Sequence, residues 1–337
     1  MGWLGPGTFV DDVVVAVDRG RIEFAGGGAT IADDVPVLDV DGFIIPGVVD
    51  RHVHIGLSEP GAVVAGGVTA VRDLGWPPEV IFPLADASET PGFEGPLIRA
   101  VGPIITCRGG YPARAEWAPR GTALEVGGPE LAAEAVRQVL DQSGIPVVKI
   151  ALNSDEGPTL TDEELVAICD EAHERDARVT CHAQGRGQVE RALGGGVDEF
   201  AHCPWSETLS DDVVGRMVGT EMRIVSTLDI LSRGQDTPEL RRATDNLNRF
   251  LQAGGAVAYG TDLGNGSIPP GIHVAEAWHL RRAGLSTEGV IESMTFLPLQ
   301  QGKPADLVAL AANPFEDLDA LADVKLVLRG GRVVRSD

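Results

Sequence analysis

Two histidines separated by a single residue stand shortly after an apolar run near the start of the chain. The run covers residues 43–49, and His52 and His54 come soon after it. Because side chains alternate between the two faces of a strand, residues two apart point the same way. Two imidazoles side by side at the end of a buried strand can bind one metal ion. The alternative is two ordinary polar residues where a strand meets a loop, so the rest of the sequence has to decide.

Lysine is scarce in this chain, and one lysine stands inside an apolar, strand-like run. Of the 27 basic residues, only Lys149, Lys303 and Lys325 are lysines. Lys149 is enclosed by valine, isoleucine and leucine in residues 145–152, where an ammonium group carries a large desolvation cost. Either this lysine pairs with an acid such as Asp155, or its pKa is low enough for the neutral amine to take up CO₂. We favour the second alternative, because the resulting carbamate is an anionic ligand that can bridge two metals.

Three further residues of metal-binding type end strand-like runs later in the chain. The runs 177–182, 197–202 and 257–262 end in His182, His202 and Asp262. Either histidine alone is more often a satisfied residue at a strand end, and the aspartate alone could be a helix cap. Together with the first pair and Lys149, however, they place six residues of metal-binding or carbamate-forming type at the ends of strands. Chance does not readily explain such a distribution.

The middle of the chain alternates strand-like and helical patterns. The strand-like runs are 43–49, 68–72, 97–106, 146–152, 178–182, 199–201, 223–227 and 256–259. Helical patterns lie between them, most clearly at 129–142, 161–175, 187–193, 238–253 and 274–283, and residues 161–164 form a capping box. This alternation predicts an α/β fold, specifically a (β/α)₈ TIM barrel. A doubly wound open sheet is the alternative, which we disfavour because the candidate ligands end many different strands.

Both ends of the chain have a different, β-rich character. The β-branched run 13–17, the turn at 18–21 and the run 22–25 predict a hairpin. Near the other end, residues 305–310 and 324–334 also read as strands. We therefore expect a small, β-sandwich-like domain built from residues 1–42 and 302–337, with the barrel over residues 43–301.

Composition narrows the choice of partners and compartment. The net charge is −23, so nucleic acid and anionic membrane surfaces are poor partners. No apolar run is long enough to span a bilayer, and residues 1–7 lack the basic start and apolar core of a signal peptide. The four cysteines are scattered and form no C-x-x-C pair, which predicts a reducing, cytoplasmic setting without disulfides. Self-association into a homo-oligomer is left open.

Several stretches resemble the amidohydrolase superfamily over nearly the whole chain. They are PGVVDRHVH (46–54), GVTAVRDLG (67–75), YGTD (259–262) and GKPADLV (302–308), the last being similar to the family's GKxADLV pattern. The branch of imidazolonepropionase-like and prolidase-like hydrolases looks closest. Compared with that family, the N-terminus starts late and the connection from 295 to 301 is short. These departures concern the small domain and leave the ligand positions intact.

The resemblance implies a binuclear metal site with a role for each of the six residues. His52, His54 and Asp262 would bind the more buried metal, His182 and His202 the second, and Lys149 would bridge them as a carbamate. A bridging hydroxide would be the nucleophile, and the second metal would polarise the scissile carbonyl. Asp262 and His202 are the implied catalytic residues, with Asp262 shuttling a proton to the leaving nitrogen. Zinc is the default metal for a histidine-rich site, with manganese, iron or cobalt as alternatives.

Contacts to the substrate are expected from loops at the mouth of the barrel. The loop after residue 107 carries Arg108, a candidate clamp for a carboxylate, and Tyr111, a candidate donor to the carbonyl oxygen. The alternatives are a surface arginine and a packing tyrosine. Trp205 is either a pocket wall or ordinary packing. Among the other residues, we expect Cys181, Cys203, His173 and Tyr259 to be packed, and find no clear ligand spacing for His273 or His279.

These observations predict a metal-dependent hydrolase that cleaves an amide or peptide-like C–N bond of a small molecule. Ring opening of a cyclic amide or imidazolone is a second enzymatic hypothesis, and a lyase or isomerase acting on a specialised metabolite is a third. A non-catalytic relative that keeps the barrel for binding or assembly is the rival from another class. Such relatives typically lose metal ligands, whereas all six are present here.

Overall fold

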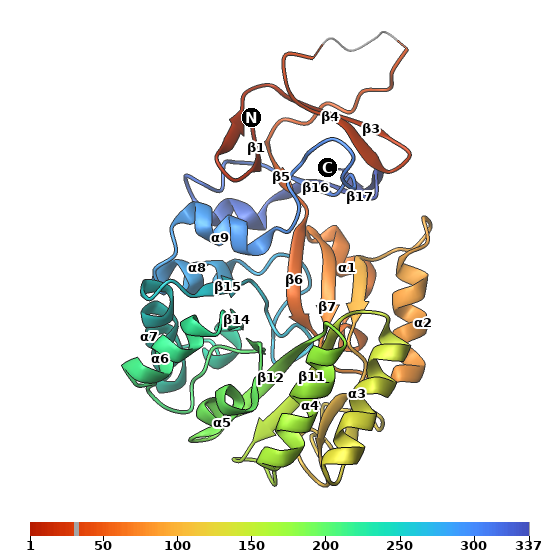
Figure 1. Cartoon of the computed structure of the whole chain (residues 1–337). Coiled ribbons are helices and arrows are strands. Elements are labelled where there is room, and N and C mark those ends of the chain that lie inside the picture. The colour runs from red at the N-terminus through yellow and green to blue at the C-terminus, as the bar shows by residue number, and fades with distance from the viewer. Residues whose placement is uncertain (30–33, 337) are drawn as a thin grey trace.

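Parallel strands with helices packed outside them form the larger part of the molecule (Figure 1). The structure is a computed structural model that describes residues 1–29 and 34–336. One sheet has the order β6-β7-β8, and a second has the order β10-β9-β11-β12-β13-β14-β15. The strands are β6 (Val48–Val53), β7 (Val68–Asp73), β8 (Leu97–Ala100), β9 (Ile104–Cys107), β10 (Ala123–Val126), β11 (Val147–Asn153), β12 (Arg178–Gln184), β13 (Glu199–Phe200), β14 (Arg223–Val225) and β15 (Ala256–Ala258).

Individual hydrogen bonds join the edges of these two sheets. The Arg51 amide donates to the carbonyl of Tyr259 at 3.1 Å, and the His54 amide donates to Leu263 at 2.7 Å. They link β6, the first strand, to the segment that follows β15, the last one. The architecture is the predicted (β/α)₈ TIM barrel, in which the ends of β6 and β15 lie side by side. Residues near position 52 and near position 262 are therefore neighbours.

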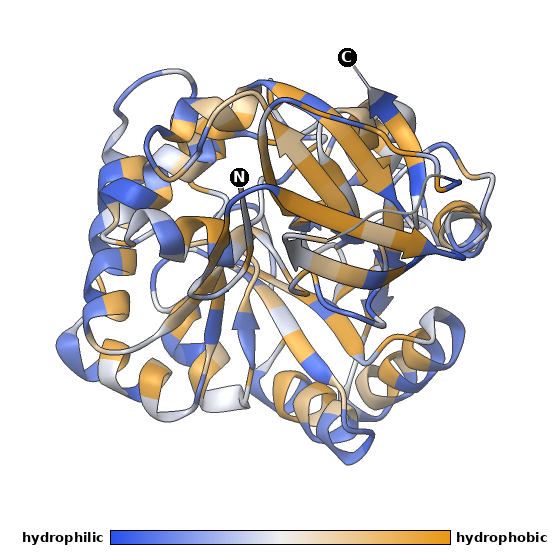
Figure 2. Cartoon of the chain, turned by 90° about the horizontal axis from the view of Figure 1, so that it is seen from above, coloured by the Kyte–Doolittle hydropathy of each residue, from blue (hydrophilic) through white to orange (hydrophobic). Residues whose placement is uncertain are grey.

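The helices present apolar faces to the strands and polar faces outward, and Figure 2 shows this alternation of colours along them. The predicted capping box is confirmed in α4, where the Glu164 amide donates to Thr161 Oγ1 and the Thr161 amide donates to the Glu164 carboxylate. No helix in the described part of the chain has the length and apolar character to cross a membrane. The helices are α1 (Pro60–Ala65), α2 (Pro78–Ser88), α3 (Pro129–Ser143), α4 (Asp162–Glu174), α5 (Gln188–Gly195), α6 (Asp211–Gly219), α7 (Pro238–Gln252), α8 (Val274–Arg282) and α9 (Thr287–Met294).

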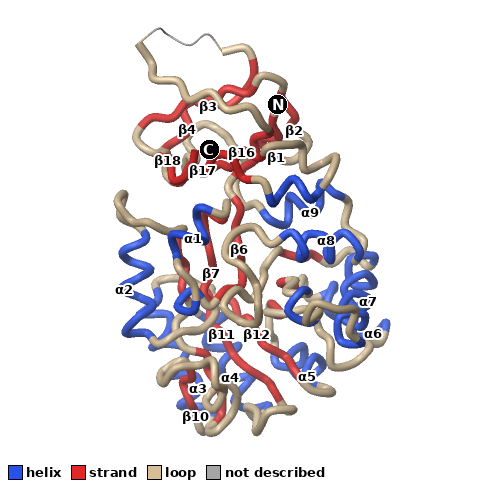
Figure 3. The backbone as a smooth tube through the Cα atoms, turned by 180° about the vertical axis from the view of Figure 1, so that it is seen from behind, coloured by secondary structure: helices blue, strands red, loops and turns tan. Residues whose placement is uncertain are grey.

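A smaller β domain combines both ends of the chain, seen at the top of Figures 1 and 3. Its main sheet has the order β18-β17-β16-β5-β1-β2, and β3 pairs with β4 as the predicted hairpin. Leu4, Ile22, Leu307 and Leu326 form its separate apolar core. The strands are β1 (Gly2–Gly5), β2 (Thr8–Val10), β3 (Val13–Asp18), β4 (Arg21–Gly27), β5 (Phe43–Pro46), β16 (Leu307–Leu310), β17 (Val324–Arg329) and β18 (Arg332–Ser336).

The predicted single strand over 43–49 was wrong, because the chain passes from one sheet to the other at Gly47. β5 pairs with β16 of the small domain, whereas β6 pairs with β7 of the barrel. The Gly47 amide donates to Asp306, and a Cβ at Gly47 would lie 2.2 Å from Thr69 Oγ1, so only glycine fits this crossing. The predicted strand over 97–106 likewise divides into β8 and β9. The domain boundaries at 42/43 and 301/302 stay a prediction.

Candidate metal centre

Three side chains from the first and last barrel strands converge at the carboxyl end of β6. His52 Nε2 lies 3.5 Å and His54 Nε2 3.4 Å from the same oxygen, Oδ1 of Asp262. One ligand atom from each residue can be chosen so that all three lie within 4.8 Å of one another. All three residues are buried. Two imidazoles and a carboxylate at such distances can hold a divalent cation.

Backbone carbonyls orient both histidines toward this point. His52 Nδ1 lies 2.7 Å from the carbonyl oxygen of Ala201, and His54 Nδ1 lies 3.0 Å from that of Gly75. A carbonyl only accepts, so each Nδ1 carries the proton and each Nε2 keeps its lone pair. Such a partner on the far side of the ring is what holds metal-binding histidines in place.

Asp50 ties the first strand to the last and was missed by the sequence analysis. Its carboxylate accepts from the His52 amide at 3.0 Å, from the Thr261 amide at 3.1 Å and from Thr261 Oγ1 at 2.5 Å. Burial raises the pKa of Asp50 to about 7, although these hydrogen bonds act to lower it. Asp262 adopts a positive φ of 63°, an uncommon conformation for a residue other than glycine. Asp50 therefore stabilises the turn that presents Asp262.

The second pair of histidines lies beside the first. The His202 ring centroid is 4.5 Å from that of His52 and 4.9 Å from that of His182. His202 Nδ1 lies 2.8 Å from Thr227 Oγ1, another contact that the sequence did not indicate. His182 is held through its other nitrogen: Nε2 lies 3.2 Å from the amide oxygen of Gln184, which leaves Nδ1 as the atom available to a metal.

Lys149 is buried, and it is close enough to His52, His182 and His202 for its charge to lower their pKa values. It is 2% exposed, and its Nζ has no hydrogen-bond partner among the described residues. The ion pair with Asp155 that was the alternative does not form; Asp155 is exposed. Burial lowers the pKa of Lys149 to about 7, although the Asp262 carboxylate acts to raise it. An orphaned amine of this kind fits the chemistry of a carbamate, which replaces a buried cation with two oxygen ligands.

Burial keeps the imidazoles of His52, His182 and His202 neutral, as metal ligands must be. Burial lowers the pKa of His182 to about 3, and the charge of Lys149 adds to the effect. Burial also holds the pKa values of His52 and His202 well below their ordinary value. The six predicted residues thus fit the donor set of a two-metal site.

Three aromatic rings surround the histidines. Tyr111 stacks on His182 with centroids 4.8 Å apart, and Trp205 meets both His182 and His202 edge-on at 5.8 and 5.5 Å. Trp117 lies 4.4 Å from the His54 ring, a contact that sequence reasoning missed because its loop has no periodic pattern. Burial, and then the charge of Asp262, raise the pKa of Tyr111, so its hydroxyl stays protonated.

The other residues discussed in the sequence analysis are not part of this cluster of histidines and aromatic rings. Arg108 is exposed and lies beside Gly127. Cys181 and Cys203 are buried, as predicted. The prediction that His173 is packed was wrong, since it is exposed and pairs with Asp198 at 3.0 Å. The last two histidines both contact Asp229, His273 at 2.7 Å and His279 at 3.1 Å.

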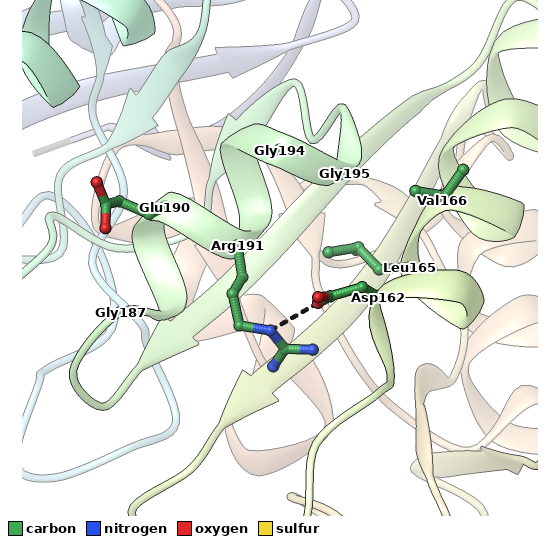
Figure 4. A pocket seen from close by; sticks show the side chains of 8 residues that line it. All are labelled: Asp162, Leu165, Val166, Gly187, Glu190, Arg191, Gly194 and Gly195. Atoms are coloured by element: carbon green, nitrogen blue, oxygen red, sulfur yellow. Dashed lines mark hydrogen bonds and ion pairs between the residues drawn. The ribbon is translucent and has the colours of Figure 1, made fainter.

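A surface pocket of about 370 Å³ lies elsewhere, between α4 and α5 (Figure 4). Its arginine, Arg191, is already bound to Asp162 at 2.8 Å and to the carbonyl of Leu160 at 2.6 Å. None of the eight residues that line it belongs to the candidate centre. The candidate metal centre is therefore identified by the convergence of its side chains and not by the size of a cavity.

Comparison with known proteins identifies relatives of this chain and its family. An uncharacterized protein of Mycobacterium tuberculosis is 26% identical over 339 residues, which cover 86% of this chain and 85% of that protein. An ochratoxinase of Aspergillus niger is 23% identical over 378 residues, 89% of this chain and 76% of the relative. The crystal structure of an Xaa-Pro dipeptidase with bound methionine aligns with a TM-score of 0.81 at 23% identity, covering 95% of this chain and 94% of that one.

A similar architecture also occurs in the crystal structure of the A. niger ochratoxinase, with a TM-score of 0.79 at 20% identity, covering 100% of this chain and 94% of that one. At such low identity these structural matches establish the fold. The sequence profile of the amidohydrolase family matches residues 43–334, which is most of the chain. This protein therefore belongs to the amidohydrolase family.

Proposed function

We propose that this protein is a metal-dependent hydrolase that cleaves an amide or peptide-like C–N bond of a small molecule. One observation carries the proposal: ligand atoms of His52, His54 and Asp262 lie within 4.8 Å of one another, and the buried Lys149 Nζ has no hydrogen-bond partner in the described part of the chain. Membership of the amidohydrolase family supports hydrolysis of C–N bonds as the reaction class. The similarity to proteins described as an ochratoxinase and as an Xaa-Pro dipeptidase supports the same reaction class.

In this proposal the six residues hold two divalent ions. His52, His54 and Asp262 would bind one, His182 Nδ1 and His202 the other, and Lys149 as a carbamate would join the two. When bound, the ions would supply an activated water and a Lewis acid for the scissile carbonyl. Zinc is the proposed metal, because imidazole and carboxylate ligands suit it. A cytoplasmic location is proposed from the four cysteines, all of which are free and buried.

The chain's own residues would move the proton and orient the substrate. Asp262 would accept a proton and deliver it to the leaving nitrogen, and Asn265 Nδ2, 2.9 Å from Asp262 Oδ1, would hold that carboxylate in place. Tyr111 would donate to the carbonyl oxygen of the substrate. Trp205, whose edge faces His182 and His202, would form a wall on their side.

The direct test combines metal analysis with a substrate screen. Metal-replete protein is expected to contain about two ions per chain, and to hydrolyse members of a panel of N-acyl amino acids, dipeptides and cyclic amides. In ¹⁸O-labelled water, hydrolysis must place solvent oxygen in the product carboxylate, whereas a lyase or isomerase need not do so. Less than half an ion per chain after careful loading, with no turnover in the panel, would defeat the proposal in favour of a binding role.

The carbamate has its own readout, which does not need activity. In a crystal of the metal-loaded protein, density should extend beyond Lys149 Nζ and contact both ions. The Lys149→Ala variant should bind less metal, and a short carboxylic acid should partly restore binding by occupying the vacated bridge. A plain lysine beside two fully occupied metals would contradict this part of the proposal.

A further inference from the structure

The loop between β9 and β10 places two neighbouring aromatic side chains against two different histidines of the candidate centre. Tyr111 stacks on His182, and Trp117 lies against His54. The loop has its own framework of short-range backbone bonds, with amides 110, 113, 115 and 118 donating three residues back along the chain. Both rings therefore belong to one locally hydrogen-bonded unit, and a change in one ring can be transmitted to the other.

A single hydrogen bond connects the two rings. Trp117 Nε1 donates to the hydroxyl oxygen of Tyr111 at 3.1 Å. An indole N–H can only donate, so it cannot accept the proton of the tyrosine. A phenol hydrogen lies near the plane of its ring and has two favoured directions. With the indole hydrogen occupying one of them, the tyrosine hydrogen is turned to the other.

The freed direction has a use in the proposed reaction. Among the described residues the Tyr111 hydroxyl accepts from Trp117 and donates to no side chain or backbone group, and its ring stacks on His182 with centroids 4.8 Å apart. A hydroxyl at this place can donate to an oxygen of a molecule bound among the histidines. Donors fixed in advance toward a developing oxyanion contribute strongly to catalysis, because no reorganisation is needed during the reaction.

We propose that Trp117 is a positioning residue, whose indole N–H sets the direction in which Tyr111 donates its hydroxyl hydrogen to the carbonyl oxygen of the substrate. This inference rests on the proposed function, since it assigns a residue to that reaction. Trp117 would not touch the reacting atoms. Its effect would pass entirely through Tyr111, and this makes it separable from a role in packing against His54.

A double-mutant cycle separates these roles, using whichever N-acyl amino acid or dipeptide the wild-type protein hydrolyses fastest. Tyr111→Phe should lower kcat about 10²-fold, as loss of one oxyanion donor does. Trp117→Phe keeps a ring but loses the N–H, and should lower kcat about tenfold with KM little changed, the scale of one hydrogen bond. In the Tyr111→Phe background the same change should cost less than about twofold. Equal losses in both backgrounds, or no loss in the Tyr111 background, would overturn the proposal.

A second readout does not depend on turnover. The five tryptophans should give five indole N–H resonances, each assigned by its own Trp→Phe variant. Tyr111→Phe should shift the Trp117 resonance and speed its exchange with solvent deuterium. Trp278 is the matched control, because its indole also donates a hydrogen bond, to Asp319 at 2.7 Å, but outside the centre. An unshifted Trp117 resonance would refute the positioning role. Failure of the wild-type protein to hydrolyse any amide would instead refute the proposed function, leaving this spectrum to decide the other question.

Discussion

The two halves of the candidate metal centre differ in how far the protein alone assembles them. In the half made by His52, His54 and Asp262, both histidines are oriented by carbonyls, and Asp50 ties the two strands together. In the other half, and among the described residues, the buried amine of Lys149 has no hydrogen-bond partner, and His182 and His202 belong to no compact group of three metal-ligating side chains. The first half is preorganised, whereas the second depends on what binds there. The two halves of the candidate centre therefore differ in how much of their geometry the chain supplies on its own.

The largest expected effect comes from removing the carboxylate of the preorganised half. Asp262→Asn should keep the fold, because asparagine tolerates the positive φ observed here. Without a proton acceptor, kcat should fall about 10²–10⁴-fold, the range for a positioned acid–base group. The measurement is steady-state kinetics on protein whose metal content has been matched to the wild type. Near-normal turnover by the fully metallated variant would show that Asp262 is a ligand only.

Loss of the Thr227 hydroxyl, which contacts His202, should have a smaller effect than loss of the Asp262 carboxylate. It should affect only the half of the centre formed by His182 and His202. Thr227→Ala removes the contact at 2.8 Å and should weaken binding of the second ion about 10–100-fold, as loss of such a supporting partner does. The first ion should be unaffected, which a titration with a chelator would reveal as two separate steps. Thr227→Ser, which keeps the hydroxyl, is the control. If the affinity for both ions falls together, the two halves are not independent.

In metal-free, CO₂-free protein, the pH dependence of folding stability should show how much the buried, unpaired Lys149 destabilises the fold. The folded pKa is lowered to about 7 from the ordinary value of 10.5, so between these values the unfolded chain binds the proton and the folded one does not. Stability should therefore rise with pH across this window, by up to about 1.4 kcal/mol per pH unit. Lys149→Met should lack this rise and be the more stable protein below pH 7.

The comparison of urea unfolding between wild type and Lys149→Met isolates this lysine, because Asp50 and other buried acids titrate equally in both. Parallel stability curves from pH 7 to 10 would mean that the amine is solvated or paired in the folded protein. In that case the second half would be as complete as the first before any metal binds.

Arg108 should give the smallest effect, since it lies exposed beside Gly127. If it attracts a carboxylate on the substrate from that position, Arg108→Met should raise KM at most about fivefold, the scale of an exposed ion pair. Neutral amides of the same substrates should respond less. A loss of more than tenfold, or an equal change for charged and neutral substrates, would contradict this role.

Local pattern indicated most barrel strands and the positions of the candidate ligands, but not the residues that support those ligands. The ligands end strands, and strand-end positions are visible in the order of apolar and polar residues. Asp50 and Thr227 escaped notice because their hydrogen bonds join residues far apart in the chain. The break at Gly47 was hidden for the same reason: β5 and β6 form one apolar run whose two parts find different sheets.

One segment bonded to each of β5 and β6 lies far along the chain, and this affects the order in which the fold can assemble during translation. Asp50 is hydrogen-bonded to Thr261, which is 211 residues later in the chain. β5 pairs with β16, which is translated later still. At about 5–20 residues per second, a ribosome needs on the order of 10–40 s to supply the first of these partners. During that time both strands leave the exit tunnel with edges unpaired, where they are prone to pair wrongly with other chains. The early strands are therefore open to mispairing for much of synthesis, and the candidate metal centre can form only after nearly all of the barrel has been translated.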